Sequence, residues 1–172
     1  MQSTPPIPAV IRRALASDAH VIAALIQQYV PLGMLLPRTP EFIGERALEF
    51  LVAVADRTVV GCVHLEEYSP SLAEVRSLVV APAWQGRGIG GALVQTLEQL
   101  ALVREYPTVF AVSNNDTFFL HRGYLPRVIG ELDRQRSEIS KFKGVYAKDM
   151  APQSAPGGGS AERSARRTDP RP

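Results

Sequence analysis

A glycine-rich turn near the middle of the chain has the composition of an anion-binding site. Residues 85 to 91 read Gln-Gly-Arg-Gly-Ile-Gly-Gly, and apolar residues recur at helical spacing at Ile89, Leu93, Leu97 and Leu100. The turn therefore lies at a helix N-terminus, where the first backbone N–H groups have no partner within the helix. Glycines let an anion approach the main chain closely. These residues predict a phosphate-binding site.

The glycines match a dinucleotide-binding pattern in spacing but not in context. Gly86, Gly88 and Gly91 satisfy G-x-G-x-x-G, which requires a strand directly before the glycines and an acidic residue after the next strand. Here residues 82 to 85 intervene, and the next predicted strand, residues 108 to 113, ends in no carboxylate. This context disfavours a dinucleotide. A turn that only caps a helix is a further interpretation.

Two charged residues precede the turn on a predicted strand, residues 72 to 81. Side chains alternate along a strand, so we expect Glu74 and Arg76 on the same face as Leu78 and Val80. This pattern suggests a core that opens into a polar site, and a surface ion pair is the alternative. Arg38 lies in a predicted loop with many prolines and glycines, where an arginine is often only solvated.

The other elements are predicted from periodicity, breakers and capping residues. Ser17 and Asp18 precede the helical stripe of Ile22, Leu25, Ile26 and Tyr29, which Pro31 ends. Thr39 is expected to cap a helix whose apolar face is Ile43, Ala47, Phe50 and Leu51. Further strands are expected at residues 9 to 12, on both sides of a turn at Asp56-Arg57, and in two short pieces within residues 124 to 150. A short helix follows Asn114, Asn115 and Asp116 and ends at Gly123.

Composition indicates one domain. The chain has 172 residues, 45% of them hydrophobic, and we expect a loose segment at 1–8, a single domain at 9–150 and a disordered tail at 151–172. Residues 1–150 hold 15 basic and 15 acidic side chains, a balance that argues against nucleic-acid or membrane binding. The single cysteine, Cys62, and three scattered histidines predict no disulfide, no metal and no covalent cysteine intermediate. We predict a cytoplasmic protein.

The wider context of the glycines resembles the GNAT superfamily of N-acetyltransferases. Residues 85 to 90 match Q/R-x-x-G-x-G/A, the acetyl-CoA pyrophosphate loop of that family. The preceding L-x-V-x-P (Leu78, Val80, Pro82) and the later F-F-x-x-x-G-Y of residues 118 to 124 are also similar. The resemblance covers about residues 9 to 148. It implies an α/β (α+β) GNAT fold, with a mixed, mostly antiparallel sheet that splays at the acetyl-CoA site and about four flanking helices.

The resemblance also implies which residues bind acetyl-CoA. The backbone of Leu78, Val79 and Val80 is expected to hold the pantetheine and polarise the thioester carbonyl. The pyrophosphate is expected at the glycine turn, and Asn115 and Phe119 from the later motif are further cofactor-binding candidates. The residues of the turn are Gln85, Gly86, Arg87, Gly88, Ile89, Gly90 and Gly91.

Acetyl transfer to an amine needs a group that accepts the proton of the amine. Glu74 lies eleven residues before Gln85, in the register of the general-base glutamate of the histone-acetylating branch of the superfamily. It is the first choice, with Glu66 and Glu67 as second choices. The family commonly has a tyrosine acid where this chain has Phe119. Tyr124, Ser113 and a water molecule are the possible substitutes.

A narrower resemblance concerns the acceptor. The segments L-L-P-R, G-C-x-x-L and A-E-x-x-x-L-x-V-x-P are similar to the acetyltransferase module of N-acetylglutamate synthases. This resemblance implies a small-molecule acceptor, an acidic amino acid such as glutamate, and a place in arginine biosynthesis. Arg38, Arg76, Lys141 and Lys143 are the candidates for binding its carboxylates. Another amine, a protein N-terminus, or a non-catalytic acyl-CoA-binding module are the alternatives, and a homodimer is possible.

Overall fold

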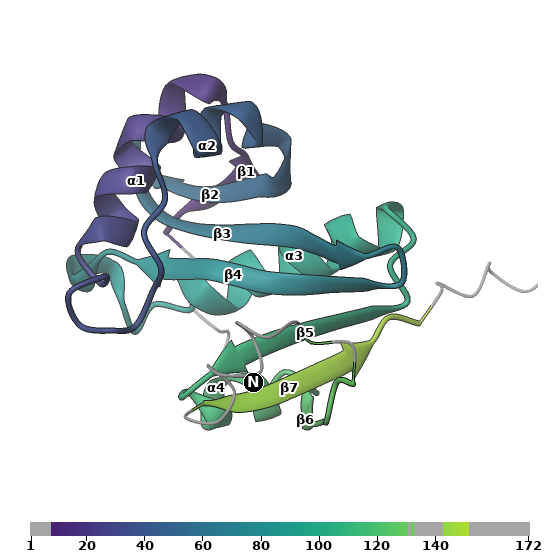
Figure 1. The fold of residues 1–172 in the computed structure, drawn as a ribbon. Coiled ribbons are helices and arrows are strands. Elements are labelled where there is room, and N and C mark those ends of the chain that lie inside the picture. The colour runs from purple at the N-terminus through teal and green to yellow at the C-terminus, as the bar shows by residue number, and fades with distance from the viewer. Residues whose placement is uncertain (1–7, 131, 133–142, 152–172) are drawn as a thin grey trace, which may run out of the picture.

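The computed structural model describes residues 8–130, 132 and 143–151. Within them the chain forms one seven-stranded sheet in the order β1-β2-β3-β4-β5-β7-β6 (Figure 1). All neighbours are antiparallel except β4 and β5, which run parallel. The strands are β1 (Val10–Arg13), β2 (Phe50–Ala55), β3 (Thr58–Ser69), β4 (Leu72–Val80), β5 (Thr108–Ser113), β6 (Leu125–Pro126) and β7 (Gly144–Asp149).

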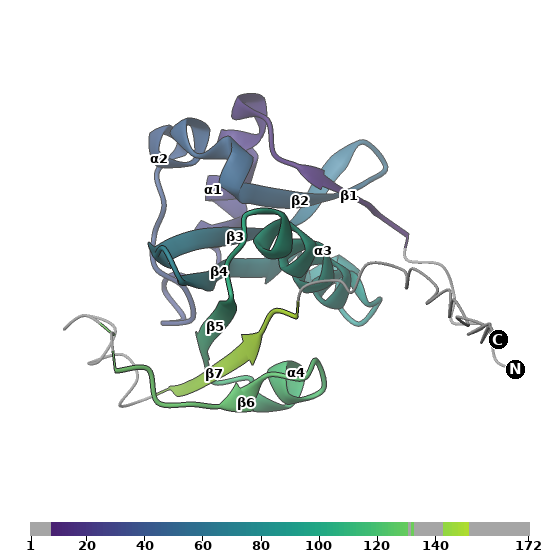
Figure 2. The same cartoon turned by 90° about the vertical axis from the view of Figure 1, so that its right-hand side faces the viewer.

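Helices cover both faces of this sheet. α1 and α2 lie on one side of strands β1 to β4, and α3 lies on the other side (Figure 2). The helices of the described residues are α1 (Ala19–Gln27), α2 (Pro40–Glu45), α3 (Ile89–Val103) and α4 (Asp116–Leu120), with 3₁₀ turns η1 (Ala16–Asp18), η2 (Ala47–Glu49) and η3 (Pro82–Trp84). None of these helices combines the length and the apolar character needed to cross a membrane. The arrangement confirms the predicted fold class.

Local sequence signals fix several boundaries as predicted. Thr39 caps α2, because its hydroxyl accepts a hydrogen bond from the backbone N–H of Phe42 at 3.2 Å. Asp56 and Arg57 both have positive φ, 48° and 63°, as a two-residue type I′ hairpin turn requires. The α3 helix begins at the glycines, and Asn115 caps α4.

The prediction that Phe50 and Leu51 belong to the apolar face of the α2 helix is wrong. The helix ends at Glu45, and Phe50 is the first residue of β2. Phe50 and Leu51 are both buried, but on opposite faces of the sheet, one with α1 and the other with α3. An apolar run of this length is compatible with a buried strand as well as with a helix. It forms a strand because β2 pairs with both β1 and β3.

The sheet opens between β4 and β5. These strands pair only through Leu72, Ala73 and Glu74, which lie opposite Thr108, Val109 and Phe110. Beyond Glu74 the two strands diverge, as the gap between their left-hand ends in Figure 1 shows. Within the described part of the chain, the edge of β4 that faces β5 therefore has no strand partner from Val75 to Val80.

A β-bulge in β4 shifts the alternation of its side chains, so that residues after the bulge point to the face opposite the one expected from regular alternation. His64 of β3 pairs with Arg76, but Cys62 pairs with Val79, so β4 has one residue more than β3 at this point. Ser77 takes a positive φ of 50° in the bulge. Val75 consequently packs on the α3 side, and so do Leu78 and Val80. The expectation that Glu74 and Arg76 share a face with Leu78 and Val80 is therefore wrong.

Candidate active site

The open edge of β4 forms the wall of a large cavity, with a volume of about 1180 Å³. Every residue from 74 to 80 lines it, as do the glycine turn, the end of β5 and the loop before α2. A strand rises about 3.3 Å per residue, so the wall between Glu74 and Val80 is roughly 20 Å long. The glycine turn therefore lies at one end of an extended cavity and Glu74 at the other.

The glycine turn has the conformation of an anion site. Gly86 and Gly88 have positive φ, 73° and 81°, and Gly88 is the N-cap of α3. The Cβ position of Gly86 faces open space, and no acidic residue lies in the first turn of α3. The first residues of α3 line this end of the cavity, and at a helix N-terminus the free N–H groups and the helix dipole favour negative charge. The residues present thus fit the pyrophosphate of acetyl-CoA.

The side chains of the turn have structural contacts. Gln85 donates from Nε2 to the carbonyl of Val80 and to the hydroxyl of Tyr29, both at 2.9 Å, and thereby fixes the turn to the end of β4. Arg87 stacks over the Trp84 ring at 4.8 Å and donates to the carbonyl of Ala83. Arg87 is not among the described residues that line the cavity. Its phosphate-binding role stays a prediction that its present side-chain position does not favour.

Glu74 is the one carboxylate among the described residues that line the cavity. It is only 3% exposed, and it lies on β4 opposite Glu66 of β3 and Phe110 of β5. Nε of Arg76 lies 4.0 Å from its Oε2 and supplies a counter-charge. Among the described residues the lining includes neither histidine nor cysteine, so Glu74 is their one candidate side chain for accepting a proton near neutral pH.

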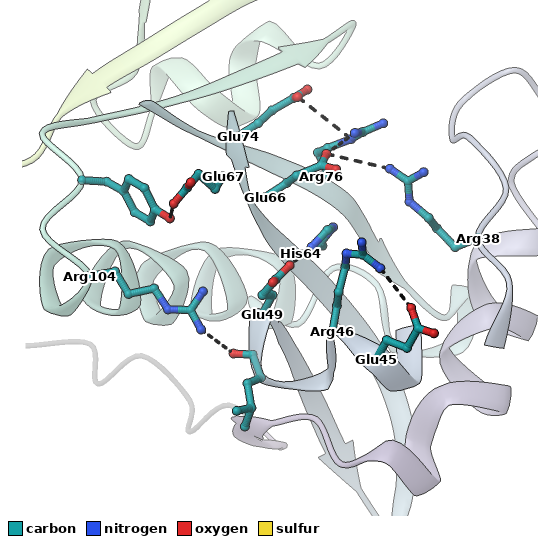
Figure 3. A network of polar contacts seen from close by, with 12 residues as sticks. Arg38, Glu45, Arg46, Glu49, His64, Glu66, Glu67, Glu74, Arg76 and Arg104 are labelled. Atoms are coloured by element: carbon teal, nitrogen blue, oxygen red, sulfur yellow. Dashed lines mark hydrogen bonds and ion pairs between the residues drawn. The ribbon is translucent and has the colours of Figure 1, made fainter. Parts of the chain in front are cut away.

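The second-choice bases have other partners (Figure 3). Glu66 accepts a hydrogen bond from Nη1 of Arg76, and its Oε2 lies 3.9 Å from Nη2 of Arg38. Glu67 accepts a hydrogen bond from the hydroxyl of Tyr106. Neither carboxylate is among the residues lining the cavity. Glu66 instead holds two arginines that do line it.

His64 supports this wall from the side of α2. Its Nε2 lies 3.0 Å from Oε2 of Glu49, and its ring stacks on Phe50 at 4.2 Å. Burial lowers the pKa of His64 below its ordinary value, although Glu49 opposes the shift. The ring is therefore neutral at physiological pH. Cys62 is also buried, and burial raises the pKa of its thiol to about 12, so it stays protonated.

The position where the family commonly has a tyrosine is part of the core. Phe119 is buried, stacks on Tyr146 and meets Phe118 edge to face, although it also lines the cavity. Tyr124 is fully buried beside Glu98, which together with burial raises the pKa of its hydroxyl, and it does not line the cavity. Of the two side chains considered as substitutes for a general acid, Ser113 lines the cavity and Tyr124 does not, and a water molecule is the third substitute.

Three of the four acceptor-binding candidates line the cavity. They are Arg38, Arg76 and Lys143, and Lys143 donates to the carbonyls of Gly33 and Met34 at 3.4 Å. Arg76 is held between Glu66 and Glu74, whereas the 14%-exposed Arg38 side chain lies over the ring of Phe42. Lys141 lies outside the described residues.

Sequence reasoning missed two polar residues of the cavity. The hydroxyl of Tyr29 donates to the carbonyl of Val80 at 3.1 Å, although its spacing marked it only as part of a helical stripe. Arg122 follows α4 and lines the cavity near the glycines. Its position directly before Gly123 gave no signal, because the contact depends on how α4 packs beside α3.

Comparison with known proteins agrees with this geometry. Residues 46–125 match the model of the acetyltransferase (GNAT) domain. An uncharacterized N-acetyltransferase of Chlorobaculum tepidum is 34% identical over 114 residues, which are 66% of this chain and 74% of that protein. The amino-acid acetyltransferase of Mycobacterium tuberculosis is 35% identical over 118 residues, which are 67% of each chain.

A solved structure shows the same fold. The crystal structure of N-acetylglutamate synthase from Neisseria gonorrhoeae, complexed with coenzyme A and N-acetyl-glutamate, superposes with a TM-score of 0.74 at 26% identity. The match covers 83% of this chain and 35% of that one. The chain belongs to the GNAT family of acetyltransferases. It is an acyltransferase that depends on acetyl-CoA, as the open edge of β4 and the glycine turn also indicate.

Proposed function

We propose that this enzyme acetylates the α-amino group of a small acidic amino acid, with glutamate preferred. The observation that carries the proposal is the charge of the cavity lining, which among the described residues holds one carboxylate, Glu74, and four cationic side chains. Arg38, Arg76 and Lys143 are the three cations other than Arg122, which lies against Gly91 at the glycine end. An anionic acceptor fits such a lining better than a cationic one.

Glu74 is the proposed general base. An ammonium group has no lone pair, so the acceptor nitrogen must lose a proton before or while it attacks the thioester carbonyl. Glu74 takes that proton directly or through a water molecule. The new bond joins the nitrogen to the acetyl carbon, and the bond from that carbon to sulfur breaks. The departing thiolate gains a proton from a group in the cavity, and Ser113 is the one of the two hydroxyls considered from sequence that lines it.

The open edge of β4 is proposed to orient the thioester. Backbone groups of residues 75 to 80 that point toward β5 have no strand partner there, and an extended pantetheine chain offers amide groups to pair with them. Residues Leu78, Val79 and Val80 lie at the part of this edge after the bulge. A backbone N–H aimed at the carbonyl oxygen would stabilise the negative charge that develops on it.

Arg38 is the proposed partner of an acceptor carboxylate. Arg76 is held by an ion pair with Glu66 and lies beside Glu74, so it serves first as their counter-charge. Arg38 has a longer contact with Glu66, 3.9 Å, and comes from the loop that borders the same end of the cavity. A guanidinium matches a carboxylate bidentately, which favours an amino acid over an unsubstituted amine.

The relatives support an amino-acid acceptor. The Mycobacterium tuberculosis protein is an amino-acid acetyltransferase, and the Neisseria gonorrhoeae synthase was crystallised with N-acetyl-glutamate. Since this chain spans 35% of the synthase, the match concerns only that part of it. These names favour glutamate, and with it a role in arginine biosynthesis, over a polyamine or a protein N-terminus.

A thiol-release assay with a panel of acceptors tests the proposal. Free thiol should appear with time from acetyl-CoA and glutamate, more slowly with aspartate and glutamine, and not with a polyamine. Equal rates on glutamate, glutamine and a polyamine would contradict it, because a cationic site cannot be indifferent to the charge of its acceptor.

A further inference from the structure

Arg122 is held rigidly beside the glycine turn. Its Nη1 donates to the carbonyl of Phe118 at 2.8 Å, and its guanidinium carbon lies 3.7 Å from the centre of the Phe118 ring. Gly123, with a positive φ of 81°, ends the α4 segment directly after it. These contacts hold the guanidinium in one orientation, so the Arg122 side chain loses less conformational entropy when a ligand binds.

The space for this guanidinium depends on Gly91. A Cβ on Gly91 would clash with Nη2 of Arg122 and come within 3.2 Å of its guanidinium carbon. Gly91 is the third residue of α3 and does not have a positive φ, unlike Gly86 and Gly88. Glycine inside a helix costs about 1 kcal/mol relative to alanine, so its presence there calls for a reason. The absence of a Cβ at Gly91 leaves room for the Arg122 guanidinium against the first turn of α3, which accounts for the glycine.

Among the described residues, Arg122 is also the cation that lines the cavity beside the glycines. Arg87, which the sequence placed beside the phosphate, stacks on Trp84 and does not line the cavity. Glu98, the carboxylate that faces Arg122 and Tyr124 from α3, forms an ion pair with Lys148 at 2.9 Å. The charge of Arg122 is therefore available to an anion at the first turn of α3.

We propose that Arg122 binds a phosphate group of acetyl-CoA together with the N–H groups of the first turn of α3, and that Gly91 is glycine to admit it. CoA carries such groups in its pyrophosphate and in its 3′-phosphate, and a guanidinium recognises either bidentately. The inference depends on acetyl-CoA use and is independent of the acceptor, so an error about glutamate leaves it untouched.

Calorimetry with CoA and with dephospho-CoA, which lacks the 3′-phosphate, tests the role of Arg122. Arg122→Gln should weaken CoA binding roughly 10-fold to 100-fold, as expected for the loss of one charge-assisted hydrogen-bonded pair. A similar loss for dephospho-CoA assigns Arg122 to the pyrophosphate, and a loss seen only with CoA assigns it to the 3′-phosphate. Arg122→Lys, which keeps the charge, should recover part of the affinity.

The matched control is Arg127→Gln, which removes a half-buried arginine that pairs with Asp149 and does not line the cavity. It should leave CoA binding within about two-fold. Unchanged CoA binding by an Arg122→Gln protein with an intact unfolding transition would overturn the proposal. An equal loss in Arg127→Gln would also overturn it, because general charge would then explain the effect.

A double-mutant cycle tests the role of Gly91. Gly91→Ala should weaken CoA binding in the wild-type background, because the new Cβ displaces the guanidinium. In an Arg122→Ala background the same change should have almost no further effect, since the space is then empty. Additive losses would mean that the Cβ meets the phosphate itself, and the proposed reason for Gly91 would be wrong.

Discussion

Glu66 and Arg76 form an ion pair across β3 and β4 that also sets the surroundings of Glu74. Glu66 lies directly opposite Glu74 in the sheet register, and like charges at such positions repel. The guanidinium of Arg76 lies between them, with Nη1 donating to Glu66 and Nε 4.0 Å from Glu74 (Figure 3). Arg76 therefore offsets the repulsion between these two neighbouring carboxylates, together with Arg38, which lies 3.9 Å from Glu66.

Removing Arg76 should destabilise the fold more than removing most surface arginines. We expect Arg76→Gln to lower the free energy of unfolding by roughly 2 kcal/mol, less than for a fully buried pair because both side chains keep some exposure. Urea unfolding measures the change. Adding Glu74→Gln should restore part of the loss, since the repulsion with Glu66 then disappears. A double variant that is less stable than Arg76→Gln alone would contradict this account.

Loss of Glu74 should affect turnover and not cofactor binding. Glu74→Gln is expected to lower kcat roughly 100-fold or more near neutral pH, with acetyl-CoA affinity unchanged within a few-fold. The defect should shrink at high pH, where the amine deprotonates without help. Thiol release across a pH series measures this, with exposed Glu45→Gln as the control. A loss that is the same at every pH would mean that Glu74 holds the acceptor or the strand.

Arg38 should determine the affinity for an acidic acceptor. Arg38→Ala is expected to raise the KM for glutamate roughly 10-fold to 100-fold, since a charge-assisted pair contributes about 1.5–3 kcal/mol. The KM for acetyl-CoA should stay nearly the same, because the glycine turn lies at the other end of the cavity. Steady-state kinetics with each substrate varied in turn separates the two effects. An equal rise in both KM values would point to a collapsed loop instead of a lost carboxylate partner.

His64 should make stability fall in weak acid. Its pKa is lower in the folded protein than the ordinary value of 6.5, so the unfolded chain binds the proton more readily. The contribution of neutral His64 to the free energy of unfolding is complete above about pH 6.5. It is lost as the pH falls toward the pKa of His64 in the folded protein, with a slope of at most about 1.4 kcal/mol per pH unit. Urea unfolding between pH 7 and pH 5 measures it. His64→Gln should remove the slope in this window, and an unchanged slope would exclude His64 as its source.

Local signals in the sequence determined the glycine turn and several element boundaries. The glycines at the start of α3, the Thr39 cap and the Asp56-Arg57 hairpin each depend on residues next to one another, and the structure has them where predicted. The open edge of β4 followed from the family resemblance carried by the glycine motif. These features could be read from the chain because their geometry is set by backbone preferences over a few residues.

Contacts between distant segments decided the rest. The bulge at Ser77 moved Glu74 and Arg76 to the face opposite Leu78 and Val80, because β4 is one residue longer than β3 between their paired positions. Strand periodicity cannot reveal such an insertion, since it depends on the partner strand. The packing of α4 beside α3 likewise brought Arg122 to the glycines, a contact between positions 31 residues apart in the sequence.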